Sequence, residues 1–326
     1  MRAIRVDEFG GPDAARLADL ETPRAGPDEV RIRVRAAGVN FADTLMVQGR
    51  YQATPPLPFT PGMEIAGDVV EAGANIKWFK PGDRAIAVLD HGGFAEQALA
   101  HHSRIMPIPR GMGYEEAAAS PIVYGTSHVA LTHRTRLLPG ETLLVHGAAG
   151  GAGLAAVEIG KALGATVIGV ASTPEKRKIV AEYGADHVLD PSAEVIHERV
   201  RELTGGAGAN VIYDPVGGDT FNASLRCAAF EARIIIVGFA GGKIQRIPAN
   251  ILLVKNISAI GYYWGAYAGH RLQLLRESFA ELKRLYEDGK MKPLVGATFP
   301  LEETAAALAH LSDRKAIGKT VITMGR

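Results

Sequence analysis

Small residues gather in one short run of this chain, and their order indicates a particular chemistry. The run follows the apolar stretch 142–146 and leads directly into the helical pattern 154–163. A glycine turn between a strand and a helix lets a pyrophosphate touch the backbone, and the helix start presents unpaired N–H groups to that anion. We therefore expect a dinucleotide site whose contacts come from Ala149, Gly150, Gly151, Ala152 and Gly153.

The surrounding sequence supports this interpretation. The common dinucleotide fingerprint is G-x-G-x-x-G, and Ala148 stands where its first glycine would be. Gly164 can end the helix, and the apolar run 166–170 then supplies a second strand, so the segment has the size of a β-α-β unit. A glycine turn that serves packing alone is the alternative.

The residues after the second strand bear on which nicotinamide cofactor is bound. NAD sites usually place an acidic residue there for the ribose 2′-hydroxyl, whereas NADP sites need cations and hydroxyls. No acid directly follows Val170; Ser172 and Thr173 can donate to a phosphate, and Lys176 lies in the first turn of the next helix. This pattern favours NADPH. The alternative is that Thr173 caps a helix that starts at Pro174 and carries a solvated basic face.

Composition limits the classes of protein that this chain can represent. Its 326 residues suffice for two domains, and 47% hydrophobic and 22% charged residues are typical of a globular protein. The net charge of +1 argues against nucleic acid or an anionic membrane as the main partner. A single cysteine, Cys227, excludes an internal disulfide and a cysteine-built zinc site. The first residues show no apolar signal segment, so we expect a cytoplasmic protein without a membrane span.

Two patterns of secondary structure divide the chain. Residues 2–109 show short β runs and turns, which predict a compact antiparallel, barrel-like domain, and residues 114–131 turn helical. From residue 141 strands alternate with helices, which predicts a doubly wound parallel sheet with strands at 143–146, 166–170, 187–189, 210–213, 234–237 and 257–261. A long amphipathic helix is expected at 271–287. The predicted domains are 1–120, completed by 266–326, and 121–265.

The motifs, taken in order, resemble those of the medium-chain dehydrogenase/reductase superfamily, and within it the zinc-free quinone oxidoreductases related to ζ-crystallin. The segments that carry the resemblance run nearly end to end: 37–44 (AGVNFADT), 61–67 (PGMEIAG), 145–153 (VHGAAGGAG) and 211–218 (VIYDPVGG). The resemblance implies an α/β fold in which a GroES-like antiparallel β-barrel domain accompanies a Rossmann domain with a doubly wound parallel sheet.

The zinc alcohol dehydrogenases of this superfamily hold a catalytic metal, and the matching positions here lack its ligands. Asn40 stands where the first cysteine would be, and Met63 replaces the histidine that precedes Glu64. Without a Lewis acid, hydride transfer to an ordinary ketone lacks its main electrophilic help, whereas a quinone or activated enone is already electrophilic. The missing ligands therefore predict no metal site and a conjugated acceptor.

The resemblance also implies which residues form the rest of the site. Asn40 and Tyr51 would line the cleft opposite the cofactor and donate hydrogen bonds to the substrate oxygen. Alternatively, Asn40 is a strand-end amide that bonds locally, and Tyr51 is a half-buried surface tyrosine. Asp43 is expected to cap a helix that starts at Thr44. Further cofactor contacts are expected from Val216, Val237, Gly238, Phe239 and Tyr262.

These observations predict an NADPH-dependent, metal-free oxidoreductase that reduces small-molecule quinones or activated enones. An enoyl-thioester (CoA) C=C reductase is the enzymatic alternative, although no clear basic cluster for a CoA phosphate occurs in the first domain. An NADPH-binding structural or RNA-binding protein similar to the crystallins is the alternative of another class, and the near-neutral charge counts against RNA. A homodimer is expected, because strand 257–261 would otherwise be an exposed apolar edge.

Overall fold

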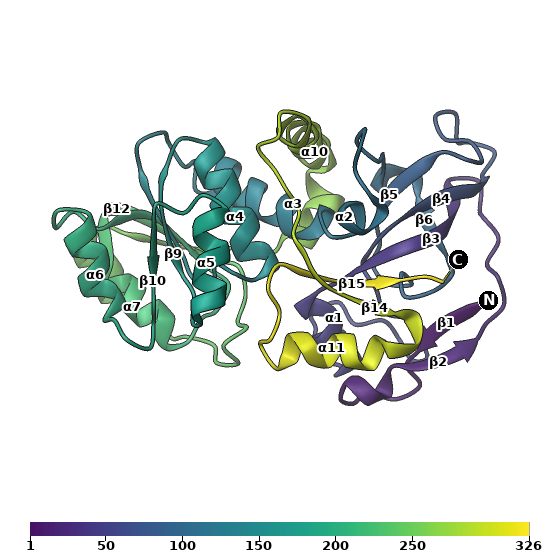
Figure 1. Ribbon diagram of the computed structural model, residues 1–326, viewed down its shortest axis with the longest axis horizontal. Coiled ribbons are helices and arrows are strands. Elements are labelled where there is room, and N and C mark those ends of the chain that lie inside the picture. Colours follow the sequence, from purple (N-terminus) through teal and green to yellow (C-terminus); the bar gives the residue numbers. More distant parts are fainter. Residues whose placement is uncertain (326) are drawn as a thin grey trace. The chain divides into compact units, whose positions relative to one another are not determined.

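The computed structural model describes residues 1–325, and the chain divides into two compact units. The first unit comprises Met1–Ile122 and the segment from Pro293 onward; the second comprises Val123–Lys292. The elements of the first unit are β1 (Arg2–Arg5), η1 (Pro12–Ala14), β2 (Arg16–Asp19), β3 (Glu29–Val39), α1 (Phe41–Val47), β4 (Glu64–Ala72), β5 (Arg84–Val88), β6 (Gln97–His101), η2 (His102–Arg104), β7 (Ile105–Pro107), α2 (Tyr114–Ala118), β14 (Val295–Pro300), η5 (Leu301–Glu303), α11 (Thr304–Ser312) and β15 (Lys319–Thr323) (Figure 1).

A largely antiparallel sheet forms the body of the first unit, as the sequence predicts. Its strand order is β14-β15-β3-β4-β5-β7, and β6 also pairs with β3. Only β14 and β15 in this order run parallel, and helix α11 makes the crossover that such a pair requires. Buried and more accessible residues alternate along the first part of β3, but all of 36–39 are buried. The residue that follows this strand, Asn40, therefore begins inside the unit and not on its surface.

The helical stretch predicted at 114–131 is interrupted in the structure. Helix α2 ends at Ala118 and α3 (Pro121–Val129) starts again at a proline. Proline lacks an N–H and suits the first turn of a helix, so it separates the two helices. A π-helical turn, η3 (Ala130–Arg134), then follows α3.

The second unit is a doubly wound α/β domain, which confirms the predicted Rossmann architecture. Its sheet has the order β10-β9-β8-β11-β12-β13, and every neighbouring pair is parallel. Helices α4 and α5 lie on one side of it and α6 and α7 on the other (Figure 1). The elements after α3 and η3 are β8 (Thr142–Val145), α4 (Gly151–Ala162), β9 (Thr166–Val170), α5 (Pro174–Glu182), β10 (His187–Leu189), α6 (Ile196–Leu203), β11 (Ala209–Asp214), α7 (Asp219–Cys227), β12 (Ala228–Ile236), α8 (Ala249–Lys255), β13 (Ser258–Gly261), η4 (Trp264–Ala266), α9 (Tyr267–His270) and α10 (Leu272–Glu287).

The structure places residues 266–292 in the second unit, whereas the sequence assigned them to the first domain. Helix α10 explains the difference, because its contacts are with the start of the second unit. Ser278 hydrogen-bonds His128 at 2.9 Å, and the rings of Phe279 and Trp264 meet edge to face. The amphipathic pattern of this helix identified the helix itself but could not indicate which unit its apolar side covers.

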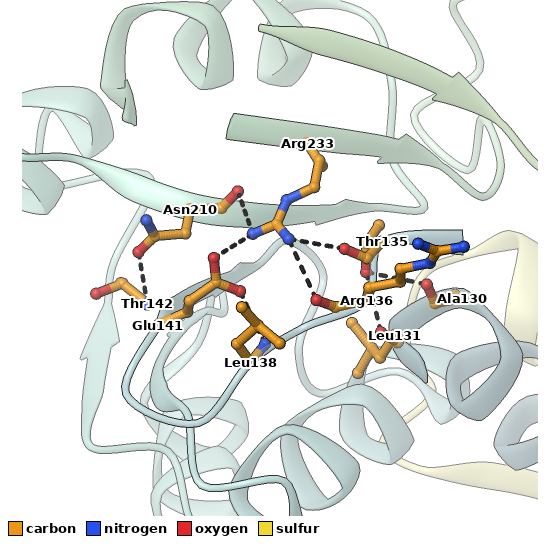
Figure 2. A network of polar contacts seen from close by, with 9 residues as sticks. All are labelled: Ala130, Leu131, Thr135, Arg136, Leu138, Glu141, Thr142, Asn210 and Arg233. Carbon is orange, nitrogen blue, oxygen red and sulfur yellow. Dashed lines mark hydrogen bonds and ion pairs between the residues drawn. The ribbon is translucent and has the colours of Figure 1, made fainter. Parts of the chain in front are cut away.

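The Arg233 side chain in β12 makes polar contacts at the amino-terminal ends of the central strands (Figure 2). The Arg233 guanidinium donates to the carbonyl oxygens of Thr135 and Arg136 at 2.8 and 3.2 Å, and it pairs with the Glu141 carboxylate. The Asn210 side chain accepts the backbone N–H of Thr142 at 2.9 Å. The amino ends of β8 and β11 are thus fixed by polar contacts, which leaves their carboxyl ends for the glycine turn.

Among residues 1–325, no helix is both long enough and apolar enough to cross a lipid bilayer.

Candidate functional site

The glycine run lies at the carboxyl end of β8, as the sequence predicts. Gly147 turns the chain with φ +57°, and the Ala148 N–H donates to the Val170 carbonyl oxygen of β9 at 3.0 Å. Helix α4 then begins at Gly151 with Gly150 as its N-cap residue, which has no capping side chain. The first N–H groups of a helix have no acceptor within it. Helix α4 therefore presents free backbone donors and a positive dipole end, a ready anion site.

Two glycines of this turn serve different purposes. A Cβ on Gly153 would lie 2.3 Å from the carbonyl oxygen of Gly147, so packing alone requires glycine there. A Cβ on Gly150 would lie 3.5 Å from the same oxygen, which is ordinary contact, and Gly150 adopts a conformation that any residue can adopt. Packing therefore explains Gly153 but not Gly150. The open space beside Gly150 fits a group that must approach the backbone closely.

The residues expected at a 2′-phosphate follow β9. Thr173 is the N-cap of α5, and its hydroxyl accepts the Lys176 N–H at 3.2 Å, so the helix-capping alternative describes this side chain. The hydroxyl keeps its own hydrogen to donate elsewhere. Ser172 is exposed, and Lys176 is half-buried, which lowers the pKa of its ammonium group. The three residues lie together on the turn from β9 into α5.

Sequence reasoning missed Arg177, which lies beside this turn. Its guanidinium pairs with the Asp190 carboxylate at 2.7 Å and donates to the Ser172 carbonyl oxygen at 3.2 Å. Hydrogen bonds from Ser192, followed by smaller effects that include the charge of Arg177, lower the pKa of Asp190. The basic residues of the helix that starts at Pro174 indicated only a solvated basic face. The partner Asp190 lies after β10, and only the fold brings it to this arginine.

The loops after β11 and β12 lie against each other at the same edge of the sheet. Val237 donates its N–H to the Asp214 carbonyl oxygen at 2.9 Å, and Gly241 donates to that of Val216 at 2.9 Å. The structure thus gathers Val216, Val237, Gly238 and Phe239 at one place, as the prediction requires. Tyr262 has a different role in the fold, because its hydroxyl donates to the Thr126 carbonyl oxygen at 3.0 Å and burial raises its pKa.

Two buried polar residues, His146 and Asp214, lie where the strand order reverses, between β8 and β11. The Asp214 carboxylate accepts the N–H groups of Val216 and Gly217 with one oxygen, at 2.9 Å each, while its other oxygen is buried and has no hydrogen-bond partner among residues 1–325. His146 shares a hydrogen bond of 2.9 Å with Ser224, and burial lowers its pKa. Ligands of doubly wound sheets bind at this reversal point. The sequence signal for these two residues was their position at the carboxyl ends of strands, since His146 follows β8 and Asp214 ends β11.

In the first unit, Asn40 belongs to a buried polar cluster that contains both an acid and a base. Its Nδ2 donates to Glu64 Oε1 at 2.8 Å, and its Oδ1 accepts from the Lys319 ammonium at 2.7 Å. Lys319 also donates to Glu64 Oε1 at 2.7 Å and to the Val39 carbonyl oxygen at 2.8 Å, so all three of its donors are used. Glu64 is fully buried and Lys319 is only 5% exposed. We call Asn40, Glu64 and Lys319 the amide cluster.

Gly38 makes room for the amide cluster. A Cβ at this position would lie 2.4 Å from Glu64 Oε1 and from the carbonyl oxygen of Ala118. The other carboxylate oxygen of Glu64 accepts the Ile122 N–H at 2.8 Å. Asn40 lies at a strand end, as the local-amide alternative expects, but its side chain also has partners 24 and 279 residues away.

Helix α1 begins three residues earlier than expected, at Phe41, and its N-cap residue is Asn40. Asp43 is therefore inside the first turn, where its carboxylate accepts the N–H groups of Asn40 at 2.8 Å and Gly62 at 3.2 Å. Complete burial raises the pKa of Asp43 to about 7. The sequence placed the cap at Asp43 because aspartate is a strong capping residue, but Asp43 is the third helical residue and accepts the N–H of the N-cap residue Asn40, as in a capping box.

Tyr51 lies in the turn after α1 and is half-buried. Its ring packs against the hydrophobic core of the first unit, and its carbonyl oxygen accepts the Thr54 hydroxyl at 2.7 Å. Asn40 thus precedes α1, and Tyr51 lies beyond its C-cap residue Gln48. Among residues 1–325, no group of three histidine, cysteine, aspartate or glutamate side chains is arranged to hold a metal ion.

Comparison with known proteins assigns both units. Residues 26–110 match the alcohol dehydrogenase GroES-like domain, which confirms the predicted class of the first unit, and residues 151–284 match the zinc-binding dehydrogenase family. The chain is 45% identical to a quinone oxidoreductase-like protein 2 homolog of Nematostella vectensis, over 98% of this chain and 88% of that protein. It is 36% identical to a quinone oxidoreductase of Pseudomonas aeruginosa, over 98% and 99% of the two chains.

Among solved structures, Escherichia coli quinone oxidoreductase complexed with NADPH superimposes with a TM-score of 0.92 at 30% identity, over 99% of this chain and 100% of that one. Similarity of this extent covers both units and all four motifs that carried the resemblance. The chain is therefore an oxidoreductase that belongs to the quinone oxidoreductase family of the medium-chain dehydrogenases/reductases.

Proposed function

We propose that this protein reduces quinones or activated enones with NADPH and without a catalytic metal. The observation that carries the proposal is the amide cluster. At the position where the zinc enzymes of the superfamily hold a metal ligand, the chain places an amide that is fixed by a buried ammonium and a buried carboxylate. An amide donor suits an acceptor whose own conjugation spreads the developing charge.

The second unit fits the cofactor. The free N–H groups at the start of α4 and the space beside Gly150 would receive the pyrophosphate. Ser172, Thr173 and Lys176 would hold the 2′-phosphate, and no carboxylate directly follows β9 to favour the NAD ribose. Val216, Val237, Gly238, Phe239 and Tyr262 would border the rest of the cofactor. NADPH, when bound, supplies the hydride.

The chain's own residues would act on the acceptor. One hydrogen of the Asn40 amide nitrogen is donated to Glu64, and the second has no acceptor among the described residues. This second N–H can donate to the acceptor oxygen as negative charge develops on it. Tyr51 can orient the same oxygen through its hydroxyl. The Asn40 amide and the Tyr51 hydroxyl are uncharged, weak hydrogen-bond donors. The proposal therefore requires an acceptor that is already electrophilic before it binds.

The donor set also disfavours a metal at this position. A divalent cation would face the Lys319 ammonium, which already occupies Oδ1 of Asn40 and Oε1 of Glu64. The remaining carboxylate oxygen accepts a backbone N–H. Zinc prefers cysteine, histidine and carboxylate ligands in tetrahedral sets, and the amide cluster provides only one carboxylate. Zinc independence is thus proposed from the residues that are present.

A homodimer is part of the same proposal. Strand β13 pairs only with β12 in the described sheet, so its other edge is unpaired. The preceding helix α8 exposes Leu253 and Val254 by 77% and 74%. An edge strand can pair antiparallel with its own copy across a two-fold axis, which covers the edge and the apolar residues together. A measured mass of one chain at micromolar concentration would contradict this part.

The experiment that tests the proposed function is NADPH oxidation against a panel of acceptors. The panel contains 1,2- and 1,4-quinones, alkenals, enoyl-CoAs and saturated ketones, with and without a chelator. We expect turnover of quinones or alkenals that the chelator does not change. Turnover confined to saturated ketones, or lost on chelation, overturns the metal-free proposal; turnover confined to enoyl-CoAs favours the thioester alternative. NADPH binding without any turnover would favour a binding protein.

A further inference from the structure

Asn40 owes its orientation to Glu64, which belongs to the motif 61–67, and to Lys319, which lies outside all four motifs. An asparagine side chain can present its oxygen and nitrogen in either of two ways. Here the ammonium at 2.7 Å requires the oxygen on its side, and the carboxylate at 2.8 Å requires the nitrogen on the other. A flipped amide would place its N–H groups against an ammonium and its oxygen against a carboxylate. The cluster therefore allows one orientation only.

The same contacts change the strength of the remaining donor. An ammonium that bonds to an amide oxygen draws electron density from the amide nitrogen and so makes its N–H groups better donors. Both charges are buried, and interactions between buried charges and dipoles are stronger than those at a surface. The carboxylate of Glu64 compensates the charge of Lys319, so that the pair can remain inside the fold.

We infer that Lys319 and Glu64 are positioning residues for the reduction of the acceptor: they orient the Asn40 amide and polarise its free N–H toward the substrate oxygen. The inference rests on the proposed function, because it assumes that Asn40 is the donor. It assigns to a buried ion pair a role in the reactivity of an uncharged side chain. Lys319 itself touches no reacting atom in this scheme, because its three donors are already used.

The test separates this role from a structural one with paired variants. Lys319→Met leaves a buried carboxylate without its cation and is expected to lower the melting temperature. The double variant Lys319→Met/Glu64→Gln removes both charges, so it should regain stability. If the pair served the fold alone, the double variant would regain activity as well. We expect kcat with a quinone to stay about tenfold below that of the unmodified protein, the effect of losing one good hydrogen bond.

The dependence on acceptor strength provides a second readout. With a series of 1,4-quinones of increasing reduction potential, a weakened donor should slow the poorest acceptors most. The plot of log kcat against reduction potential should therefore become steeper in the double variant. Parallel plots, or full recovery of kcat, overturn the inference. Lys161→Met is the matched control, because it removes a lysine–carboxylate pair, with Asp186, in the second unit and should leave the slope unchanged.

Asn40→Ala distinguishes a failure of this inference from a failure of the proposed function. If Asn40→Ala has no effect on quinone reduction, Asn40 is not the donor and both fail. If it slows reduction while the double variant reduces quinones normally, only the role of Lys319 and Glu64 is overturned. Thermal unfolding of each variant, measured alongside, shows that the comparison is made on folded protein.

Discussion

The glycine turn and the amide cluster are two sites built in opposite ways. The turn at 147–153 consists of small residues that follow one another, and its chemistry comes from backbone N–H groups at the start of α4. The amide cluster joins side chains from residues 40, 64 and 319, and its chemistry comes from buried charges. A site formed by backbone groups can be predicted from residues that are neighbours in the sequence. A side-chain site of this kind exists only after the chain has folded.

The comparison also separates two demands on the sequence. The turn tolerates no added side chain at Gly153, since the nearest obstacle is backbone. The cluster tolerates no unpaired charge, since each partner is buried. The first demand is steric and the second electrostatic, so substitutions should affect stability, binding and turnover in different proportions at the two sites.

The largest expected effect is at Gly153. Alanine there would place its Cβ 2.3 Å from the Gly147 carbonyl oxygen, and a backbone atom cannot yield as a flexible side chain would. We expect Gly153→Ala to destabilise the protein by about 1–3 kcal/mol, the usual cost of overpacking. Chemical denaturation measures this. An unchanged midpoint would mean that the turn has more room than the structure shows.

Gly150→Ala separates cofactor binding from packing in the same turn, because its Cβ would make only an ordinary van der Waals contact. The fold should be unaffected, whereas the methyl group should obstruct the pyrophosphate and raise the Kd for NADPH at least about tenfold, or ~1.4 kcal/mol. Fluorescence titration gives the Kd and denaturation gives the stability. Loss of stability without loss of affinity would show that Gly150 serves packing and not the cofactor.

Each site has a buried carboxyl group nearby in the chain, Glu158 in α4 and Asp43 in α1. The pH dependence of stability that these groups cause extends the comparison. Burial raises the pKa of Glu158 in α4 from 4.5 to about 7; Lys292 donates its N–H to one oxygen at 2.9 Å, and Tyr124 donates to the other. A folded pKa above the unfolded one means that the folded state binds the extra proton. Stability is therefore greatest at low pH and falls as the pH rises from about 4.5 to about 7.

Glu158→Gln should remove this contribution, which has a slope of at most ~1.4 kcal/mol per pH unit. The measurement is the free energy of unfolding at several pH values in that window. Asp43 beside the amide cluster, whose pKa is also raised to about 7, should contribute a similar slope that remains in the variant. A variant with the slope of the unmodified protein would contradict the assignment to Glu158.

The smallest expected effect concerns cofactor preference. Asp190 holds the Arg177 guanidinium at 2.7 Å, beside the residues expected to receive the 2′-phosphate. Asp190→Asn should release that charge and raise the preference for NADPH over NADH a few-fold, because a single ion pair at the edge of a site contributes little. Lys176→Ala should reduce the preference. Equal efficiencies with both cofactors in all three proteins would overturn the phosphate assignment.

Features that depend on neighbouring residues could be predicted from the sequence. The glycine turn, α5 and five of the six parallel strands follow from local pattern and capping, and the structure places these strands within one residue of the predicted bounds. Strand β12 is the exception, because it begins at Ala228, six residues before the predicted start. Helix α1 was less accurate, because Asn40 and Asp43 are both good caps and sequence alone did not order them. Ser120 and Pro121 interrupted a helical pattern whose apolar periodicity continued across the break.

Features that depend on contacts between residues far apart in the chain could not be predicted from the sequence. Lys319 was not singled out from the sequence, although it is buried against Glu64. Glu64 was named only as the residue that follows Met63 at the missing metal site, and Arg177 lay only within a basic helix face. In each case the partner lies at least 13 residues away, so no local pattern marks the pair. Asn40 was singled out for its position in a motif, but the reason for its orientation required the fold.

The separation of the two sites can be tested most directly by measuring NADPH affinity and single-turnover quinone reduction in the same variants. We predict that Asn40→Ala leaves the Kd for NADPH within about twofold while slowing reduction by about tenfold or more. Gly150→Ala should instead raise the Kd for NADPH, while the rate of quinone reduction at saturating NADPH stays close to that of the unmodified protein. If both variants lose affinity and reduction rate in parallel, the division between a backbone site for the cofactor and a side-chain site for the acceptor is wrong.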